Sequence, residues 1–416
     1  MEGIALHGLV VCGLRSTVRG GDTGYEEDSL YPLERNVVET ETGNRDKPLH
    51  AVRAEDRIMC VDVLRGFDMF WLVGGAGLAL GMFRVCGGKI AEALALQLEH
   101  VEWIGFRFYD LIFPLFVFVV GMSVVFSVGA VVERDGKAAA YKRILRRAVL
   151  MYLLGILYYG GMNQPWAEIR WMGVLQRLAL CYLFTGILYC HLRTRGLVVV
   201  CAALLVGYWA WLAFIPVPGQ DVVSWTKDIH WPGYIDEQFL PGRKHNGAWD
   251  PEGILSTFPA IASCLLGVFA AQILVSKAIP QNRKLILFLV GGAALAAAGY
   301  AWGLHFPVIK KIWTSSFVLV AGGYSAMLLG LFYLVVDVWK VRWWTAPFVW
   351  IGMNPLTIYM TRNFLDFNEL AKRFIGGSLS GAVSEDAAYF LQVTASLALS
   401  LIFVRFLYRK KIFLRV

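Results

Sequence analysis

The sequence predicts an all-α polytopic membrane protein with about ten transmembrane helices. Hydrophobic residues make up 57% of the 416 residues and charged residues only 17%, whereas soluble domains average about 45–50% and about 25%. Several stretches of about 20 residues contain no charge, including 196–215 and 285–304, and each is long enough to cross a hydrocarbon layer of about 30 Å. A soluble protein would have to bury all of these stretches in one core, so the composition excludes that class.

Ten apolar segments follow one another through most of the chain and are expected to span the membrane. Residues 56–416 should therefore form one transmembrane domain. Residues 20–57 are polar, and the apolar run 4–14 before them is short and interrupted by His7 and Gly8. Residues 1–55 cannot bury enough apolar area to offset the ordering entropy, so a disordered cytoplasmic tail is expected there. The predicted spans are 60–82, 109–132, 144–161, 171–191, 196–215, 254–276, 285–304, 314–337, 346–362 and 386–408.

The net charge of +8 is explained by membrane topology rather than by nucleic-acid binding, and no nucleic-acid partner is expected. Lys and Arg concentrate in connections that would all fall on one side of the membrane, and the positive-inside rule places that side in the cytoplasm. Both termini are then cytoplasmic, because the predicted number of spans is even. These basic connections are 133–147, 192–195, 277–284, 340–342 and 409–411.

The seven cysteines give no sign of a metal site or a disulfide framework. No two of them form a C-x-x-C pair, and most lie in or beside apolar segments, where a free cysteine behaves as a small hydrophobic residue. No bound metal is therefore expected.

Ionisable residues in or beside the spans are candidates for structure or chemistry, because an unpaired charge inside a membrane is costly. Asp62 and Arg65 lie three residues apart on one helix face, which favours a structural ion pair beside the small residue Gly66. Gln176 and Arg177 begin another span. An arginine there needs a partner, and either a carboxylate or a ligand phosphate would serve.

His100 lies in the connection between the first two spans, with Glu99 and Glu102 on either side. A neighbouring carboxylate can orient an imidazole and keep it basic, as a general base requires. A histidine in a loop is more often an ordinary polar residue, so the pattern alone leaves both interpretations open.

The connection 216–253 is the longest on the side that lacks the basic loops, and it mixes aromatic with polar residues. It suits either a sugar-binding rim or an aromatic belt at the membrane interface. At its end, Asp250 is expected to cap the next helix, with Pro251 as the first helical residue. Glu252 would then complement the helix dipole, and a sugar-facing role is the alternative.

Asn354 precedes Pro355 inside the predicted span 346–362. A proline within a span removes a backbone hydrogen bond and opens a polar position there. Asn354 is expected either to line a cavity or to satisfy the carbonyl groups that the proline frees.

Six stretches of the sequence together carry a resemblance to a known family. They occur in one order between residues 60 and about 360, and they resemble the heparan-α-glucosaminide N-acetyltransferase family of transmembrane acyltransferases, especially its bacterial-type members. The stretches are Val61–Phe70 (VDVLRGFDMF), Leu98–Ser123 (LEHVEWIGFRFYDLIFPLFVFVVGMS), Gly173–Arg177 (GVLQR), Gly233–Asp236 (GYID), Trp249–Leu255 (WDPEGIL) and Gly352–Tyr359 (GMNPLTIY).

The resemblance implies a multi-pass enzyme of the cell (inner) membrane with ten core helices, working as a homodimer. It implies transfer of acetyl from acetyl-CoA on the cytoplasmic side to a glucosamine amine on the other side. In the family, a histidine before the D-L-x-F-P stretch is the key catalytic residue. His100 matches it here, ten residues before Asp110, so His100 and Asp110 are the expected catalytic pair.

The remaining expected site residues fall into three groups. The acceptor is expected at polar residues on the outer side, namely Glu102, Trp103, Asp250, Glu252 and Asn354. Guanidinium groups suit the phosphates of acetyl-CoA, so the expected donor-binding residues are Arg143, Arg146, Arg147, Gln176 and Arg177. Structural roles are expected for Asp62, Arg65, Gly66 and Pro114.

The chain departs from the animal members of the family at several points. Ala76 stands where those enzymes have an asparagine near the catalytic histidine, and the stretch Thr361–Arg362–Asn363 lacks the histidine that they carry after the G-M-N motif. Those enzymes also have a large lumenal domain before the core, where this chain has residues 1–55. These departures leave the identity of the acceptor open.

Three other functions are compatible with the pattern. A transporter or flippase of a sugar or glycan would use Arg177 and Asp110 as pathway charges and would consume no acetyl-CoA. An acyltransferase for a glycan hydroxyl would consume acetyl-CoA without acetylating an amine. A purely structural membrane scaffold would leave the polar residues in the spans without a role.

Overall fold

The computed structural model describes residues 58–375 and 383–414, and within these ranges the chain is helical with no β-strand. An isolated β-bridge joins Arg170 to Gly242. The predicted all-α class is therefore confirmed. The expected tail, 1–55, lies outside the described residues, and the described residues all belong to one compact unit.

The helices of the described residues run in an order that follows the predicted apolar segments. Short π-helical or 3-10 turns interrupt or join several of them. The elements are α1 Met59–Phe70, η2 Trp71–Gly75, α2 Ala76–Cys86, α3 Gly88–Gln97, η3 Phe108–Leu111, α4 Ile112–Val124, η4 Val125–Gly129, α5 Ala130–Tyr158, η5 Gly161–Asn163, α6 Val174–His191, α7 Thr194–Phe214, α8 Trp231–Phe239, α9 Thr257–Val275, α10 Gln281–Gly303, α11 Ser315–Phe332, η6 Tyr333–Val338, α12 Ala346–Met353, α13 Pro355–Phe364, α14 Phe367–Ile375 and α16 Glu385–Arg409.

Eight helical stretches among the described residues are long and apolar enough to cross a membrane, so the protein is a multi-pass membrane protein. One of them, Phe108–Tyr158, has 51 residues and would be roughly 76 Å long if straight, more than twice the hydrocarbon thickness. It breaks at Gly136, whose φ is 82°. The predicted span 346–362 is divided into α12 and α13 at Asn354. The count of ten spans stays a prediction.

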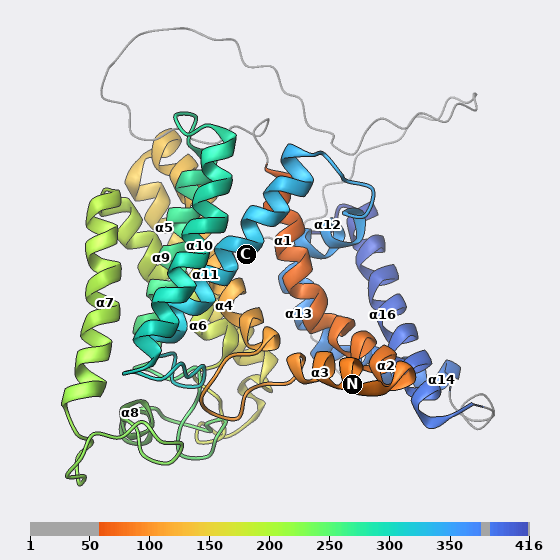
Figure 1. Cartoon of the computed structure of the whole chain (residues 1–416), viewed down its shortest axis with the longest axis horizontal. Coiled ribbons are helices and arrows are strands. Elements are labelled where there is room, and N and C mark those ends of the chain that lie inside the picture. Colours follow the sequence, from red (N-terminus) through yellow and green to blue (C-terminus); the bar gives the residue numbers. More distant parts are fainter. Residues whose placement is uncertain (1–57, 376–382, 415–416) are drawn as a thin grey trace, which may run out of the picture. The chain divides into compact units, whose positions relative to one another are not determined.

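The helices pack in two groups within this unit. In one group, α9 contacts α4, α6, α7 and α11, while α5 pairs with α6 and α10 with α11. In the other, α16 contacts α2, α12 and α14, and α1 contacts α12. Helix α1 also contacts α4 and α11 and so links the two groups (Figure 1).

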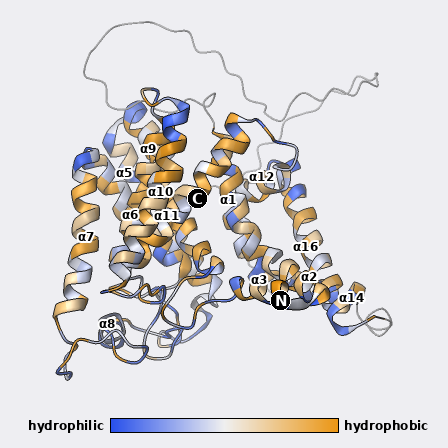
Figure 2. Ribbon diagram, viewed as in Figure 1, coloured by the Kyte–Doolittle hydropathy of each residue, from blue (hydrophilic) through white to orange (hydrophobic). Residues whose placement is uncertain are grey.

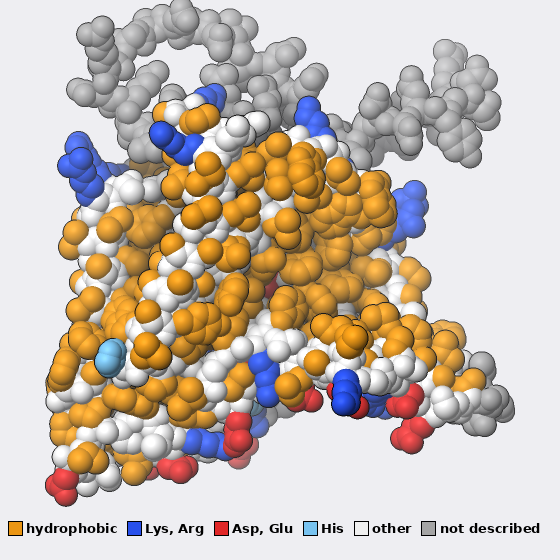
Figure 3. Space-filling view, viewed as in Figure 1, with side chains coloured by type: hydrophobic (Ala, Val, Ile, Leu, Met, Phe, Trp, Pro, Cys, Tyr) orange, Lys and Arg blue, Asp and Glu red, His pale blue; other side chains and the backbone are white. Residues whose placement is uncertain are grey.

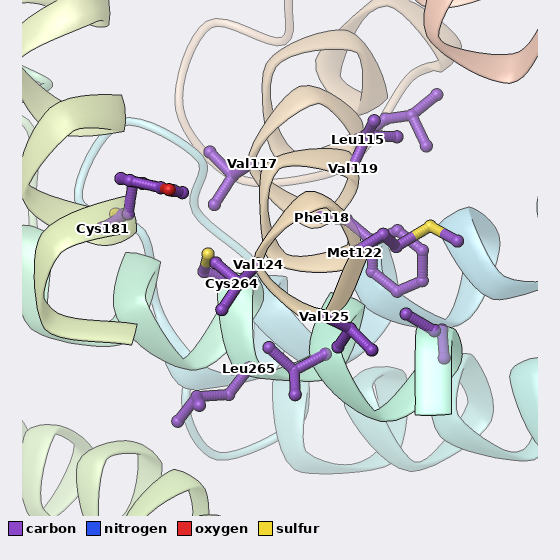
Figure 4. Packing of buried hydrophobic residues seen from close by; sticks show 14 of the residues in the cluster. Leu115, Val117, Phe118, Val119, Met122, Val124, Val125, Cys181, Cys264 and Leu265 are labelled. Carbon is purple, nitrogen blue, oxygen red and sulfur yellow. The ribbon is translucent and has the colours of Figure 1, made fainter. Parts of the chain in front are cut away.

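The centre of the first group is a close crossing of α4 and α9. A Cβ atom at Gly121 would overlap the carbonyl oxygen of Cys264, and one at Gly267 would overlap that of Phe118. Figure 4 shows the surrounding side chains, with Met122 and Leu265 among the fully buried ones. Small residues let the backbones of two membrane helices touch, so α4 and α9 are in direct backbone contact at this crossing.

Helices α1 and α12 cross in the same way. A Cβ atom at Gly66 would overlap the carbonyl oxygen of Phe348, and one at Gly352 would overlap that of Asp62. Gly66 therefore occupies a position that only a residue without a side chain can fill, as its expected structural role requires. Pro114, another residue expected to be structural, is buried in the first turn of α4.

The surface shows how the unit meets the bilayer. Hydrophobic residues cover the helices and hydrophilic ones gather at their ends (Figure 2). On the face in Figure 3, hydrophobic side chains form a broad band, with Lys and Arg along its upper margin and acidic and basic side chains mixed along its lower margin. The first residues of α7 and α10 lie on the upper side in Figure 1. That this side is cytoplasmic stays a prediction.

We expect the substitution Gly66→Leu to destabilise the protein, because the new side chain would collide with the backbone of Phe348. Overpacking of this kind costs about 1–3 kcal/mol or more. Thermal unfolding of the detergent-purified variant should show a lowered Tm. Gly207→Leu is the matched control, since a Cβ atom there meets nothing within 4 Å, and its Tm should stay at the wild-type value. Equal Tm values for both variants would contradict the close crossing.

Candidate active site

The connection after α3 brings His100 and Asp110 together. The Nδ1 atom of His100 lies 2.8 Å from Oδ1 of Asp110. Oδ2 of Asp110 accepts hydrogen bonds from the backbone N–H groups of Val101, at 3.2 Å, and Arg107, at 3.1 Å. The carboxylate is 1% exposed, whereas the His100 side chain is 53% exposed. The buried acid is thus fixed by the backbone, and the imidazole projects from it towards solvent.

This pairing assigns a tautomer to His100. A carboxylate accepts hydrogen bonds and does not donate them, so Nδ1 carries the proton and donates it to Asp110. The lone pair of Nε2 is then free to act as a base. The sequence neighbours do not supply the orienting carboxylate: Glu99 lies 3.6 Å from Arg107, and Glu102 lies 3.0 Å from Lys227.

Lys310 completes this cluster, and sequence reasoning missed it. Its Nζ donates to Oδ1 of Asp110 at 3.2 Å and lies 3.0 Å from Nδ1 of His100. Burial lowers the pKa of Lys310, although the neighbouring Asp110 carboxylate opposes this shift. The sequence did hold a signal, because Lys310 and Lys311 form a basic pair in a connection on the side that lacks the basic loops.

A second charged cluster is formed by Arg170, Asp250 and Glu252. Nε and Nη2 of Arg170 donate to the two carboxylate oxygens of Asp250, each at 2.7 Å, and Nη2 also donates to Oε2 of Glu252 at 2.8 Å. The guanidinium group lies over the ring of Tyr159 at 4.5 Å. Arg170 and Asp250 are buried. This bidentate pair is the strongest ion-pair geometry available to arginine.

The expected capping role of Asp250 is wrong. Helix α9 begins at Thr257, and Ser256 precedes it. Instead, Asp250 accepts from the backbone N–H groups of His245 and Glu252, at 3.0 and 3.1 Å, in addition to Arg170. The partner lies 80 residues away in the sequence, so a local capping pattern could not reveal it.

Asp236 holds the same turn in place. Its carboxylate accepts from the backbone N–H of Ile254 at 2.9 Å and from that of Asp250 at 3.2 Å. Burial raises the pKa of Asp236 to about 6, although these two hydrogen bonds oppose the shift. Helix α8, which carries Asp236, therefore positions the segment that presents Glu252.

Glu252 connects the two clusters electrostatically. Its side chain is 13% exposed. Burial raises the pKa of Glu252 to about 7, and the neighbouring Asp250 carboxylate adds to the shift. The charge of Glu252 also acts on Lys310. Glu252 thus pairs with Arg170 and also acts electrostatically on Lys310 of the His100 cluster.

Gln176 and Arg177 lie in the first turn of α6, and Nε2 of Gln176 donates to the carbonyl oxygen of Arg170 at 3.3 Å. Nη2 of Arg177 donates to the carbonyl oxygen of Gly253 at 3.3 Å and to the Ser256 hydroxyl, and its guanidinium group lies 5.1 Å from the ring centre of Trp313. Arg177 is fully buried, yet its Nε and Nη1 have no hydrogen-bond partner among the described residues. Buried polar atoms of this kind call for an explanation such as a bound ligand.

The expected donor residues of α5 do not lie together with Gln176 and Arg177. Arg143 and Arg146 are exposed. Only Arg147 turns inwards, where its guanidinium group lies 4.8 Å from the ring centre of Tyr182 and its Nη1 lies 3.5 Å from the Ser127 hydroxyl.

Arg65 of α1 lies close to this position. Its Nη2 donates to the Ser123 hydroxyl at 2.9 Å, and its Nη1 lies 3.6 Å from Asp62, the partner expected for a structural ion pair. The Ser127 hydroxyl, which Arg147 approaches, donates to the carbonyl oxygen of Ser123 at 2.7 Å. The structure thus brings Arg65 and Arg147 to neighbouring serines of α4 and η4.

The other expected acceptor residues have different surroundings. Glu102 forms an exposed ion pair. The indole N–H of Trp103 donates to the carbonyl oxygen of Trp225 at 2.9 Å, and its ring packs edge-on against Trp249. Asn354 is buried, and neither end of its amide has a partner in the described part of the chain. Trp103 therefore contributes packing, while Asn354 keeps its hydrogen-bonding capacity.

Two curated proteins are similar to this chain at a distant level. It is 27% identical over 373 aligned positions to the heparan-alpha-glucosaminide N-acetyltransferase of Mus musculus, which covers 75% of this chain and 54% of that protein. It is 27% identical over 422 positions to the Homo sapiens protein of the same name, which covers 86% of this chain and 60% of that protein. The chain thus spans somewhat more than half the length of these relatives. No family model matches the chain.

We expect Arg170→Met to destabilise the protein strongly, because it leaves Asp250 buried without its cationic partner. Breaking a buried ion pair in this way costs about 3–5 kcal/mol. The measurement is thermal unfolding in detergent. Lys227→Met removes the exposed partner of Glu102 and should leave the Tm unchanged, since exposed pairs contribute little. A normal Tm for Arg170→Met would show that the buried pair does not hold the segment around Glu252.

Proposed function

We propose that this protein is a membrane-embedded acyltransferase that moves acetyl from cytoplasmic acetyl-CoA to the amine of an amino sugar on the other side of the membrane. The single observation that carries the proposal is the His100–Asp110 pair, with a buried, fixed carboxylate and an outward-facing imidazole. The names of the two distant relatives support the reaction class. A homodimer stays a prediction.

In the proposed reaction, Nε2 of His100 removes a proton from the acceptor amine as its nitrogen attacks the thioester carbonyl carbon. The carboxylate of Asp110 stabilises the imidazolium that forms. The tetrahedral intermediate then loses the thiolate, and the imidazolium returns the proton to the leaving sulfur. Base catalysis of this kind contributes about 10²–10⁴ in rate. Direct transfer needs only this one histidine, so it is preferred to an acetyl-histidine intermediate.

Lys310 has a separate role in this scheme. Its ammonium group bonds the same Asp110 oxygen that faces His100 and keeps that carboxylate ionised beside the ring. Lys310 is therefore proposed as a positioning residue, because it balances the charge of the Asp110 carboxylate that orients the imidazole.

Polar atoms without partners along α5 and α6 support a path for the donor. Tyr182 in α6, Arg147 in α5 and both Gln176 and Arg177 near the outer end of α6 each have a buried polar atom that bonds nothing in the described chain. The long pantetheine arm of CoA, which carries amide groups, would satisfy such atoms. The phosphates at the nucleotide end of CoA would suit Arg147 and Arg65, since guanidinium groups bind phosphate well.

The contacts of Asp110 also weigh against a transporter. A pathway charge must exchange partners as the cargo passes, whereas Asp110 is held by two backbone N–H groups, a histidine and a lysine. An acyltransferase with a hydroxyl acceptor would use the same pair. Mass analysis of the acetylated product would distinguish an amine acceptor from a hydroxyl acceptor.

We expect His100→Ala to lower acetyl transfer at least about 100-fold, because it removes the base. The assay supplies acetyl-CoA and glucosamine to purified protein and measures N-acetylglucosamine by mass analysis, together with released CoA. Asp110→Asn should also lose activity, since an amide can stabilise the wrong tautomer of the ring. Acetyl-CoA binding by each variant is the control for folding. Full activity of His100→Ala would rule out the proposed role.

We expect Lys310→Met to lower acetyl transfer, because it removes one of the charged partners of the buried Asp110 carboxylate that orients His100. Lys310→Arg should restore part of the activity, since it keeps the positive charge. The measurement is kcat/KM for glucosamine, with acetyl-CoA binding as the control for folding. A wild-type kcat/KM in Lys310→Met would contradict this role.

A further inference from the structure

A short helix, α3, follows directly on the first stretch that is long and apolar enough to cross the membrane. That stretch, Met59–Cys86, ends with α2, and α3 covers Gly88–Gln97. Gly87 and Gly88 join the two helices with φ values of 62° and 87°. Glycine adopts this left-handed conformation far more readily than other residues, so the two glycines end the span and turn the chain. Helix α3 then packs against α2 (Figure 1).

The sides of α3 differ in character. Ile90 and Leu94 are four residues apart and share one face, and both side chains are exposed. Lys89 and Glu92 are three residues apart and share another face, which is also exposed. Ala91 is buried against the protein. The helix thus has a protein side, an apolar side and a charged side, as a helix that lies along a boundary between lipid and water requires.

The apolar side of α3 continues a surface that meets lipid. Met82 and Val85, in the last turns of α2, are exposed on the membrane-spanning stretch itself. Where α2 and α3 lie in Figure 1, Figure 3 shows hydrophobic side chains above and charged side chains below. The apolar band therefore reaches α3, and its charged margin begins there.

Helix α3 is also tied to both members of the candidate catalytic pair. The backbone N–H of Glu99 donates to the carbonyl oxygen of Leu96 at 3.3 Å, so His100 follows a fixed helix end. Oε1 of Gln97 accepts the backbone N–H of Phe108 at 3.2 Å, and Phe108 begins η3, the turn that carries Asp110. The position of α3 therefore sets the position of the His100–Asp110 pair.

We propose that α3 lies in the headgroup layer of the bilayer, with Ile90 and Leu94 against the lipid chains and Lys89 and Glu92 in water, and that this contact fixes the depth of the His100–Asp110 pair. The partner is the phospholipid surface. Ile90 and Leu94 are then positioning residues. The role of this depth rests on the proposed function, because it takes His100 as the reacting centre, where an acceptor from water meets a thioester from within the helices.

Spin labels on α3 test its depth. Cys12 and Cys86 are first replaced by serine, because the other five cysteines are buried. A nitroxide is then attached at Leu94→Cys or at Leu96→Cys, and the protein is reconstituted into phosphatidylcholine vesicles. Leu94 and Leu96 are 47% and 45% exposed, but residues two apart in a helix point to different sides. The pair therefore separates the side of α3 from simple exposure.

The label at Leu94→Cys should be relaxed more strongly by oxygen, which concentrates in lipid, than by a water-soluble nickel complex. The label at Leu96→Cys should show the reverse preference. A preference for the nickel complex at both positions would place the whole helix in water and overturn the proposal. A label at Leu94→Cys that neither reagent reaches would also overturn it, because a protein surface such as a second copy of the chain would then cover this face.

A matched pair of substitutions tests the link to His100. In the same vesicles, Leu94→Asp should lower kcat/KM for glucosamine about tenfold or more, because a carboxylate is driven out of lipid and shifts α3. Leu94→Met should keep the activity, and Leu96→Asp should behave as wild type. Acetyl-CoA binding by each variant is the control for folding. Equal kcat/KM values for Leu94→Asp and Leu96→Asp would refute the positioning role.

The label measurement needs no turnover, so it separates this proposal from the proposed function. A label at Leu94→Cys that lies in lipid, in a protein that transfers no acetyl, would retain the lipid contact of α3 and refute the acyltransferase. Acetyl transfer by a protein whose label at Leu94→Cys lies in water would retain the acyltransferase and refute the lipid contact.

Discussion

The buried carboxylate of Asp110 joins several connections at one end of the helices. One of its oxygens meets both His100 and Lys310, and the other accepts two backbone N–H groups. A buried carboxylate is costly unless each of its oxygens is paired. Because these partners come from separate parts of the chain, satisfying this one acid brings the connection after α3, the turn η3 and the loop before α11 to a single place.

The need to pair every buried charge also shapes the cluster of Arg170, Asp250 and Glu252. Arg170 and Asp250 are buried and form a bidentate pair, and Asp236 fixes the backbone of the same turn. Glu252 is the member that keeps some exposure, and burial raises its pKa to about 7. The fixed members position the turn, and Glu252 shares Nη2 of Arg170 with Asp250. The membrane helices thus position the connections, and ion pairs within those connections hold the candidate site residues in place.

Much of the fold could be predicted from the sequence, because long uncharged runs leave few alternatives in a membrane. The meeting of His100 with Asp110 followed from the family resemblance. Lys310 was missed, since its contact with Asp110 joins residues 200 positions apart and no local pattern encodes it. The capping prediction for Asp250 failed for the same reason. Among the three arginines of α5 that were expected to bind the donor, composition could not indicate that only Arg147 turns inwards, because helix orientation depends on packing.

We propose that acetyl crosses the membrane inside this protein while CoA stays on the donor side. Sealed proteoliposomes with acetyl-CoA only outside and glucosamine only inside would reveal this transfer. We expect N-acetylglucosamine inside the vesicles and an equal amount of free CoA outside. Glucosamine that leaves the vesicles unmodified, or product that forms only where both substrates share one side, would contradict it.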